Sequence, residues 1–163
     1  MKAGVVDAIR AAGGEVYAVT SEPQALASRA QLDWELSFEC VGDPHHEIAA
    51  GVSERGWFDL RTSEVNDFLI RDTKWEVSHP KGFFQPGTLA ITSDQRVLYR
   101  WRSIPTRKNA GGATSRPTPE HVWGRVQEAL SFDSAQDVVL DNEPTLDSRP
   151  PPFAFFALVL MAH

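Results

Sequence analysis

The only thiol in the 163 residues is Cys40, so no disulfide can form within this chain and no all-cysteine metal cage can be built from it. A cysteine attacks as its thiolate, which a helix N-terminus or a nearby cation stabilises. Cys40 instead lies in "LSFECV", where apolar and polar residues alternate as in a strand. We therefore expect Cys40 to be a small core residue, although it remains the one thiol candidate.

A second group that could do chemistry is formed by His45, His46 and Glu47, with His79 further along the chain. On a predicted helix the two adjacent histidines would point about 100° apart, which disfavours a shared metal ion. A surface helix is the better interpretation, and we predict no metal site. Serine, histidine and aspartate also occur, but without the nucleophile-elbow motif of a hydrolase.

A basic stretch without an acidic residue lies between Asp94 and Glu120. Its members are Arg96, Arg100, Arg102, Arg107, Lys108 and Arg116. Arg100 and Arg102 share one face of a predicted strand, and with Arg107 and Lys108 they are candidates for binding an anion or a protein partner. The alternative is a solvated edge strand whose charges prevent pairing with other chains.

The composition limits the function classes. The net charge is −6, from 16 basic and 22 acidic residues, so we predict no nucleic-acid partner. No signal peptide is recognisable, which favours the cytoplasm. The apolar tail 153–162 could form a helix of roughly 15 Å, about half of a bilayer core. It is either a last core or interface segment or a membrane-associated anchor.

Around these residues, helices and strands alternate along the first half of the chain. Helical spacing over 5–12 ends at Gly13-Gly14, and "EVYAVTS" follows as a buried strand. Ser21 is the predicted N-cap of the next helix, with Gln24 completing a capping box. After the strand "LSFECV", Asp43 is the predicted N-cap of a third helix. The alternation favours parallel strands joined by crossovers.

The second half contains a β-hairpin, "GTLAITSDQRVLYRWRS", with a turn at 93–95. A helix over 64–70 is expected before it. After it, Thr118 is the predicted cap of a final helix. The apolar stripe of that helix consists of Val122, Trp123, Val126 and Leu130. We expect one domain over 1–132, followed by an acidic, proline-rich linker and the apolar tail over 133–163.

Three segments resemble the peroxiredoxin-like branch of the alkyl hydroperoxide reductase/thiol-specific antioxidant superfamily. They are "IRAAGGEVYAVTSEP", "LSFECVGDPHHEIAAGV" and the long segment "HPKGFFQPGTLAITSDQRVLYRWRSIPTRKNAGGATSRP". The resemblance covers roughly residues 4–130. It implies an α/β, thioredoxin-like, three-layer α/β/α fold with a mixed sheet, of which the first strand is absent from this sequence.

The resemblance also implies thiol-dependent peroxide reduction and a thiol reductant as partner, without a cofactor. The cysteine that attacks peroxide in this family has no matching position here, so we expect the chain to be inactive as it stands. The family's structural cis-proline corresponds to Pro86, for which an ordinary trans proline is the alternative. The alternative function is a non-catalytic, thioredoxin-fold module that binds a protein partner.

In a thioredoxin-like sheet, the absent strand would lie between "EVYAVT" and "TLAIT". Their facing edges would then expose unpaired backbone groups. We therefore expect these two strands to close up, or the gap to be filled by a second chain or by the tail 153–162. Either the isolated chain is marginally stable or it forms a homo-oligomer.

Overall fold

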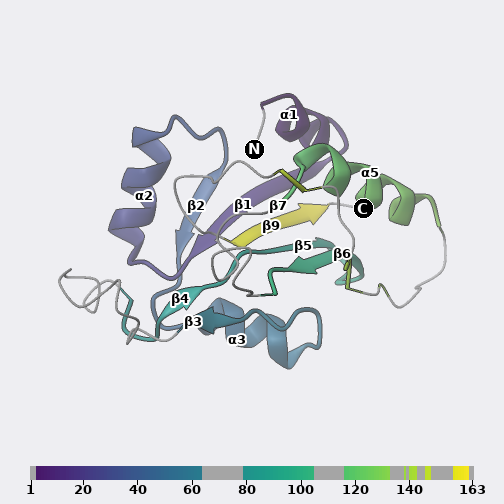
Figure 1. Cartoon of the computed structure of the whole chain (residues 1–163). Coiled ribbons are helices and arrows are strands. Elements are labelled where there is room, and N and C mark those ends of the chain that lie inside the picture. The colour runs from purple at the N-terminus through teal and green to yellow at the C-terminus, as the bar shows by residue number, and fades with distance from the viewer. Residues whose placement is uncertain are drawn as a thin grey trace.

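The computed structural model describes residues 3–63, 79–104, 116–132, 138, 140–142, 146–147 and 156–161 (Figure 1). The predicted helix over 64–70 lies outside these residues. The helices are α1 (Ala3–Ala11), α2 (Gln24–Asp33), α3 (Glu47–Glu54) and α5 (Pro119–Ser131). The strands of the main sheet are β1 (Gly14–Thr20), β2 (Glu39–Gly42), β5 (Gly87–Thr92), β6 (Val97–Arg102) and β9 (Phe156–Met161). The short strands are β3 (Thr62–Ser63), β4 (Phe83–Phe84), β7 (Arg116–Pro117) and β8 (Leu146–Asp147).

The main sheet is mixed and has the order β2-β1-β9-β5-β6. β1 and β2 are parallel, as the helical crossover between them requires, and β5 and β6 form the predicted antiparallel hairpin. β9 lies between β1 and β5, antiparallel to the first and parallel to the second. β3 pairs with β4 and β7 with β8 in two small separate sheets.

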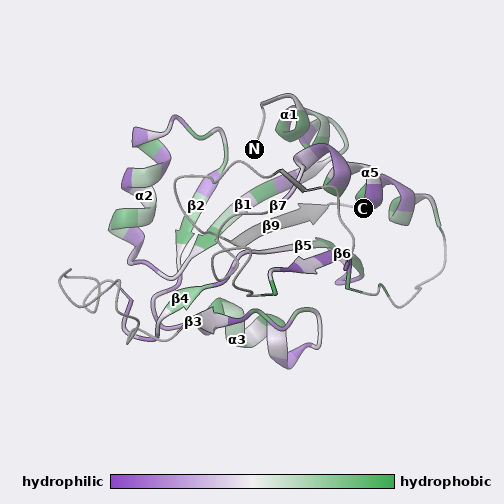
Figure 2. Cartoon of the chain, in the orientation of Figure 1, coloured by the Kyte–Doolittle hydropathy of each residue, from purple (hydrophilic) through white to green (hydrophobic). Residues whose placement is uncertain are grey.

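Two apolar clusters of side chains pack on the main sheet. The first joins α1 and α5 to the strands through buried residues that include Val6, Ile9, Val122 and Val126. The second packs α3 and the connector after it on the sheet through Val52, Phe58, Phe84, Leu89 and Ile91. Figure 1 shows α1 and α5 together above the sheet and α3 below it. The helices carry both hydrophobic and hydrophilic residues in Figure 2, as helices with one face on a sheet do. The fold is therefore α/β.

Two local predictions are confirmed. The hairpin turns at 93–95, where Gln95 has a positive φ of 73° and Thr92 accepts the Arg96 amide through its hydroxyl. Thr118 caps α5 by accepting the His121 amide at 3.2 Å, with Pro119 as the first helical residue. Both signals depend on neighbouring residues alone, which explains why the sequence predicts them well.

Two predicted helix caps are wrong. α2 begins at Gln24 with Pro23 as its N-cap, and Ser21 instead bonds to a histidine from a distant segment. α3 begins at Glu47 after His46, so Asp43 is not the N-cap residue. Its carboxylate still accepts the amides of Glu47 at 2.7 Å and Ala49 at 3.1 Å. Asp43 thus still satisfies amides at the start of α3, although it precedes the N-cap residue. The helix starts later than predicted because His46 adopts a left-handed conformation.

The tail does not stand apart from the domain. The strand formed by 156–161 occupies the middle of the sheet, so a boundary at residue 132 does not separate the tail from the fold. Of the expected linker, Leu140 packs on the second apolar cluster, and Asp141 donates its amide to the Arg100 carbonyl. Among the residues that the structure describes, no helix is long and apolar enough to cross a membrane.

The outer edge of β2 is covered by two glutamine side chains from α2. Gln31 accepts the Cys40 amide at 3.0 Å, and Gln24 donates to the Cys40 carbonyl at 2.9 Å and accepts the Gly42 amide at 2.8 Å. A Cβ at Gly42 would lie 2.5 Å from the Gln24 backbone nitrogen, so only glycine permits this approach. The edge that would otherwise pair with another strand is thereby occupied.

Candidate functional site

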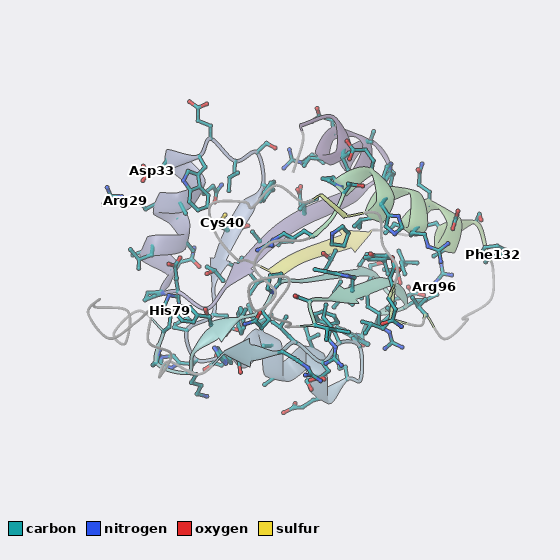
Figure 3. All side chains as sticks on the ribbon, in the orientation of Figure 1. Arg29, Asp33, Cys40, His79, Arg96 and Phe132 are labelled. Atoms are coloured by element: carbon teal, nitrogen blue, oxygen red, sulfur yellow. The ribbon has the colours of Figure 1, made fainter. Side chains whose placement is uncertain are left out.

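Cys40 lies where β2 faces α2, within the first apolar cluster (Figure 3). It is 5% exposed, as the strand pattern predicts. Burial raises the pKa of its thiol, and the neighbouring Glu39 carboxylate raises that pKa further. Among the residues that the structure describes, neither a helix N-terminus nor a cation favours the thiolate, which argues against a nucleophilic role.

We expect Cys40 to react slowly with a thiol reagent in the folded protein and rapidly in denaturant. The physical reason is that the reagent needs both access and a thiolate, and the folded chain limits both. The measurement is the labelling rate with and without denaturant at one pH. Equal rates in the two states would contradict the buried position of Cys40.

Pro86 precedes β5 and is among the most buried residues, but the cis-proline prediction is wrong. Among the residues described, no peptide bond is cis, so the Gln85–Pro86 bond is trans. The trans form is the intrinsically preferred one by about 0.5–1 kcal/mol. The Pro86 carbonyl accepts the Ser103 amide at 2.8 Å, which ties the start of β5 to the end of β6.

Arg100 and Arg102 hold the connector that follows α3. Arg102 donates to the carbonyl of Asp59 at 3.1 Å and also forms an ion pair with the Asp59 carboxylate. Arg100 makes longer contacts to two carbonyls of the same connector, at 3.4 and 3.5 Å. The Nε atoms of both arginines are buried and have no hydrogen-bond partner within the described part of the chain. The remaining anion candidates, Arg107 and Lys108, lie outside the described residues, so no joint site can be built from the four.

Polar side chains gather at the carboxyl ends of β1 and β2. We call Ser21, Glu22, Asp43, His46 and His79 the strand-end cluster. Ser21 and His79 are 3% and 4% exposed. The Nδ1 atom of His79 lies 3.0 Å from the Ser21 hydroxyl and 3.2 Å from the Ser21 carbonyl oxygen. Because a carbonyl can only accept, we assign the ring proton to Nδ1.

The other ring nitrogen of His79 faces an acid. Its Nε2 atom lies 3.8 Å from Oε1 of Glu22. Burial lowers the pKa of His79 and raises the pKa of the Glu22 carboxyl, so both groups favour their neutral forms. Burial also lowers the pKa of His46, whose ring lies 4.6 Å from the ring of Phe84.

The strand-end cluster has the residue types of a hydrolytic triad but not its accessibility. A nucleophilic serine must meet its substrate, and both Ser21 and His79 are almost completely enclosed. The network instead ties the segment 79–84 to the end of β1, with the Phe84 amide at 3.4 Å from the Ser21 hydroxyl. Sequence reasoning missed this pairing because the partners are 58 residues apart. The one local signal was a serine directly after a buried strand.

His79, which is buried, and His46, which is partly buried, predict a loss of stability in mild acid. A histidine whose folded pKa is lowered binds its proton more weakly than in the unfolded chain. Its contribution is therefore fully present above about pH 6.5 and is lost as pH falls below that value. We expect the free energy of unfolding, measured in urea, to fall between about pH 7.5 and pH 5.5.

The control is the double variant His46→Gln, His79→Gln, whose stability should change less over the same interval. Glu22 stays in both proteins, since its raised pKa acts with the opposite sign and must cancel in the comparison. An identical pH dependence in the two proteins would show that these histidines do not titrate as their burial predicts.

His45, His46 and His79, which the sequence disfavours as shared metal ligands, do not come together at one point in the described part of the structure. His45 is exposed and lies outside α3, while the His46 Nε2 atom faces the Gly82 carbonyl oxygen at 3.3 Å. Within the described residues, no group of three or more suitable side chains could hold a metal ion.

A second polar network holds the chain ahead of β9. We call Tyr99, His121 and Asp141 the tail clamp. Both the Tyr99 hydroxyl, at 3.0 Å, and the His121 Nε2 atom, at 2.7 Å, contact the same oxygen of Asp141. Burial and the bond to Asp141 raise the pKa of Tyr99, which keeps the hydroxyl protonated as a donor. The clamp thereby fixes residue 141 to β6 and α5.

Neither family models, nor curated proteins, nor solved structures give a match to this chain.

Proposed function

We propose that this chain is a thioredoxin-like module, of the peroxiredoxin-like type, that acts by binding a protein partner and not by thiol chemistry. The observation that carries the proposal is the state of its one thiol. Cys40 is buried in the sheet and its pKa is raised, whereas a peroxide-reducing cysteine needs an accessible thiolate.

The arrangement of the sheet supports the thioredoxin-like part of the proposal. In the sheet, one strand position separates the parallel strands β2 and β1 from the β5–β6 hairpin. The helix α5 follows the hairpin in the sequence and packs on the sheet. β5 runs antiparallel to β1, since β9 is antiparallel to one and parallel to the other. The intervening position is the one that the resemblance assigns to the absent strand.

The occupant of that position supports a binding role. β9 pairs with both neighbours although no short turn joins it to either, since β1 ends at Thr20 and β5 at Thr92. A sheet that accepts a strand from a distant part of the sequence has the geometry of strand addition, in which backbone hydrogen bonds supply the affinity.

The test is a peroxide-consumption assay with a thiol reductant, comparing the wild-type chain with Cys40→Ala. We expect both proteins to match the blank without protein. Alanine keeps the residue small and apolar, so the fold should persist. Turnover by the wild-type chain that disappears in Cys40→Ala would overturn the proposal and make Cys40 the site.

The second candidate is thiol-dependent peroxide reduction with a cysteine supplied from outside these 163 residues. The order of the elements favours it, because α1 precedes β1 as the active-site helix does in the proposed family. Reading the coding sequence upstream of codon 1 tests it. A strand followed by a Thr-x-x-Cys-like motif in frame would favour this candidate over the binding module.

A further inference from the structure

The central strand of the sheet comes from the segment that follows every other strand in the sequence. β9 pairs along its whole length with β1, from Gly14 opposite Met161 to Val19 opposite Phe156. On its other side it pairs with β5, from Thr88 opposite Ala157 to Thr92 opposite Met161. We call the space between β1 and β5 the strand slot (Figure 1).

Once β9 has left, the two outer edges of the sheet are less open to a partner than the strand slot. At β2, Gln24 and Gln31 occupy the backbone groups of Cys40 and Gly42. At β6, the Asp141 amide donates to the Arg100 carbonyl at 2.9 Å. A strand offered by another molecule therefore finds its best backbone partners between β1 and β5, provided β9 is elsewhere.

The connection to β9 allows it to be elsewhere. β8 ends at Asp147 and is paired with β7, and β9 begins at Phe156, so eight residues lie between them. Nine Cα–Cα steps span at most roughly 30 Å when extended. β9 can thus reach the strand slot of an adjacent copy of the chain, while β8 and the tail clamp of its own copy stay in place.

The segment that best fits an empty strand slot is a second β9. The sequence "FALVLM" is apolar, uncharged and free of proline, which is the composition of strands that pair readily. A β9 from another copy makes the same backbone pairs as the chain's own β9. The exchanged and the unexchanged arrangements therefore differ mainly in the effective concentration of β9 at the strand slot. Two copies that exchange β9 leave no strand slot empty.

We propose that β9 is an exchangeable strand and that the protein partner is a second copy of this chain, each copy filling the strand slot of the other. This inference rests on the proposed binding function and names its partner. The exchanged dimer keeps every described pair of the sheet and changes only which chain supplies β9.

The test uses full-length chains in a Cys40→Ala background. One carries Ala18→Cys in β1 and the other carries Ala157→Cys in β9, positions that lie opposite each other in the register. Opposite residues of antiparallel strands have Cα atoms about 4.5–5.5 Å apart, within the range of a disulfide. The two proteins are unfolded together, refolded together and oxidised.

We expect a covalent dimer whose disulfide joins positions 18 and 157, identified by peptide mass, in the mixture but in neither protein alone. Replacing Ala157→Cys by Leu158→Cys is the matched control, since a neighbouring residue lies on the opposite face of the strand. The pair Val16→Cys and Val159→Cys repeats the test at another opposite position, in case the first variants do not fold.

A doubly substituted chain separates the outcomes. If Ala18→Cys, Ala157→Cys in one chain forms only an intrachain disulfide, and the mixture forms none, then β9 does not exchange and the inference is overturned. If no disulfide forms in any combination, β9 does not occupy the strand slot, which overturns the inference by another route. The peroxide assay does not depend on either disulfide result. A failure of this inference can therefore be distinguished from a failure of the proposed function.

Discussion

Val159→Pro is expected to abolish the cooperative unfolding transition of this protein. Val159 lies in the central strand, opposite Val16 on one side and Ala90 on the other. Proline has no amide hydrogen, and its ring does not fit between two paired neighbours. Lost and unsatisfied backbone bonds cost about 1–3 kcal/mol each, against a typical total stability of 5–15 kcal/mol. Thermal and urea unfolding followed by circular dichroism measure the effect.

The control for this variant is Val159→Ile, which keeps the amide and the β-branched shape. This variant should still unfold cooperatively, with a free energy of unfolding lowered by no more than about 1–3 kcal/mol for the added methylene group. If Val159→Pro were as stable as Val159→Ile, the strand slot would not contain β9, and the sheet order β2-β1-β9-β5-β6 would be wrong.

Leu89→Ala should lower the free energy of unfolding by about 2–5 kcal/mol, the range for a leucine removed from a closed core. Leu89 is completely buried in the cluster that packs α3 and the connector on the sheet. Leu89 shares this cluster with the buried rings of Phe58 and Phe84, so its truncation leaves a cavity in a closely packed region.

Leu32→Ala is the matched control, because Leu32 is 77% exposed on α2 and alanine favours helix. Its stability should differ from that of the wild-type chain by no more than about 0.5 kcal/mol. Urea unfolding of the two variants side by side gives the comparison. A similar loss in both would mean that Leu89 does not lie in the core.

The sequence predicted the parts of this fold that depend on neighbouring residues. The β5–β6 hairpin, the Thr118 cap of α5 and the apolar stripe of that helix are all present. The caps at Ser21 and Asp43 were misplaced for two different reasons. Ser21 bonds to His79, and a left-handed His46 delays the start of α3. No local pattern reports the bond between Ser21 and His79.

The resemblance predicted a gap between β1 and β5, either closed by these two strands themselves or filled by a second chain or by the tail. The sequence could not choose among these outcomes, since pairing with the tail of the same chain, closure of the gap and pairing with another chain satisfy the same backbone groups. The sequence also did not indicate in which direction the strand in this position would run. A strand joined to β1 through α1 would run parallel to β1, whereas β9 runs antiparallel. The strand-end cluster and the tail clamp depend on similarly distant partners and were missed.

The place of β9 in the sequence sets the order in which the sheet can be completed during translation. Gly14 and Met161, which pair in the finished sheet, are 147 positions apart (161 − 14), and 69 residues follow Thr92 up to Met161 (161 − 92). At a synthesis rate of roughly 5–20 residues per second, β1 and β5 both exist for about 3–14 s before the strand that separates them has been made. Ribosomes that follow one another along a messenger carry copies at different stages of that interval. A newly completed β9 on one ribosome is then a near neighbour of an unfilled gap on the next.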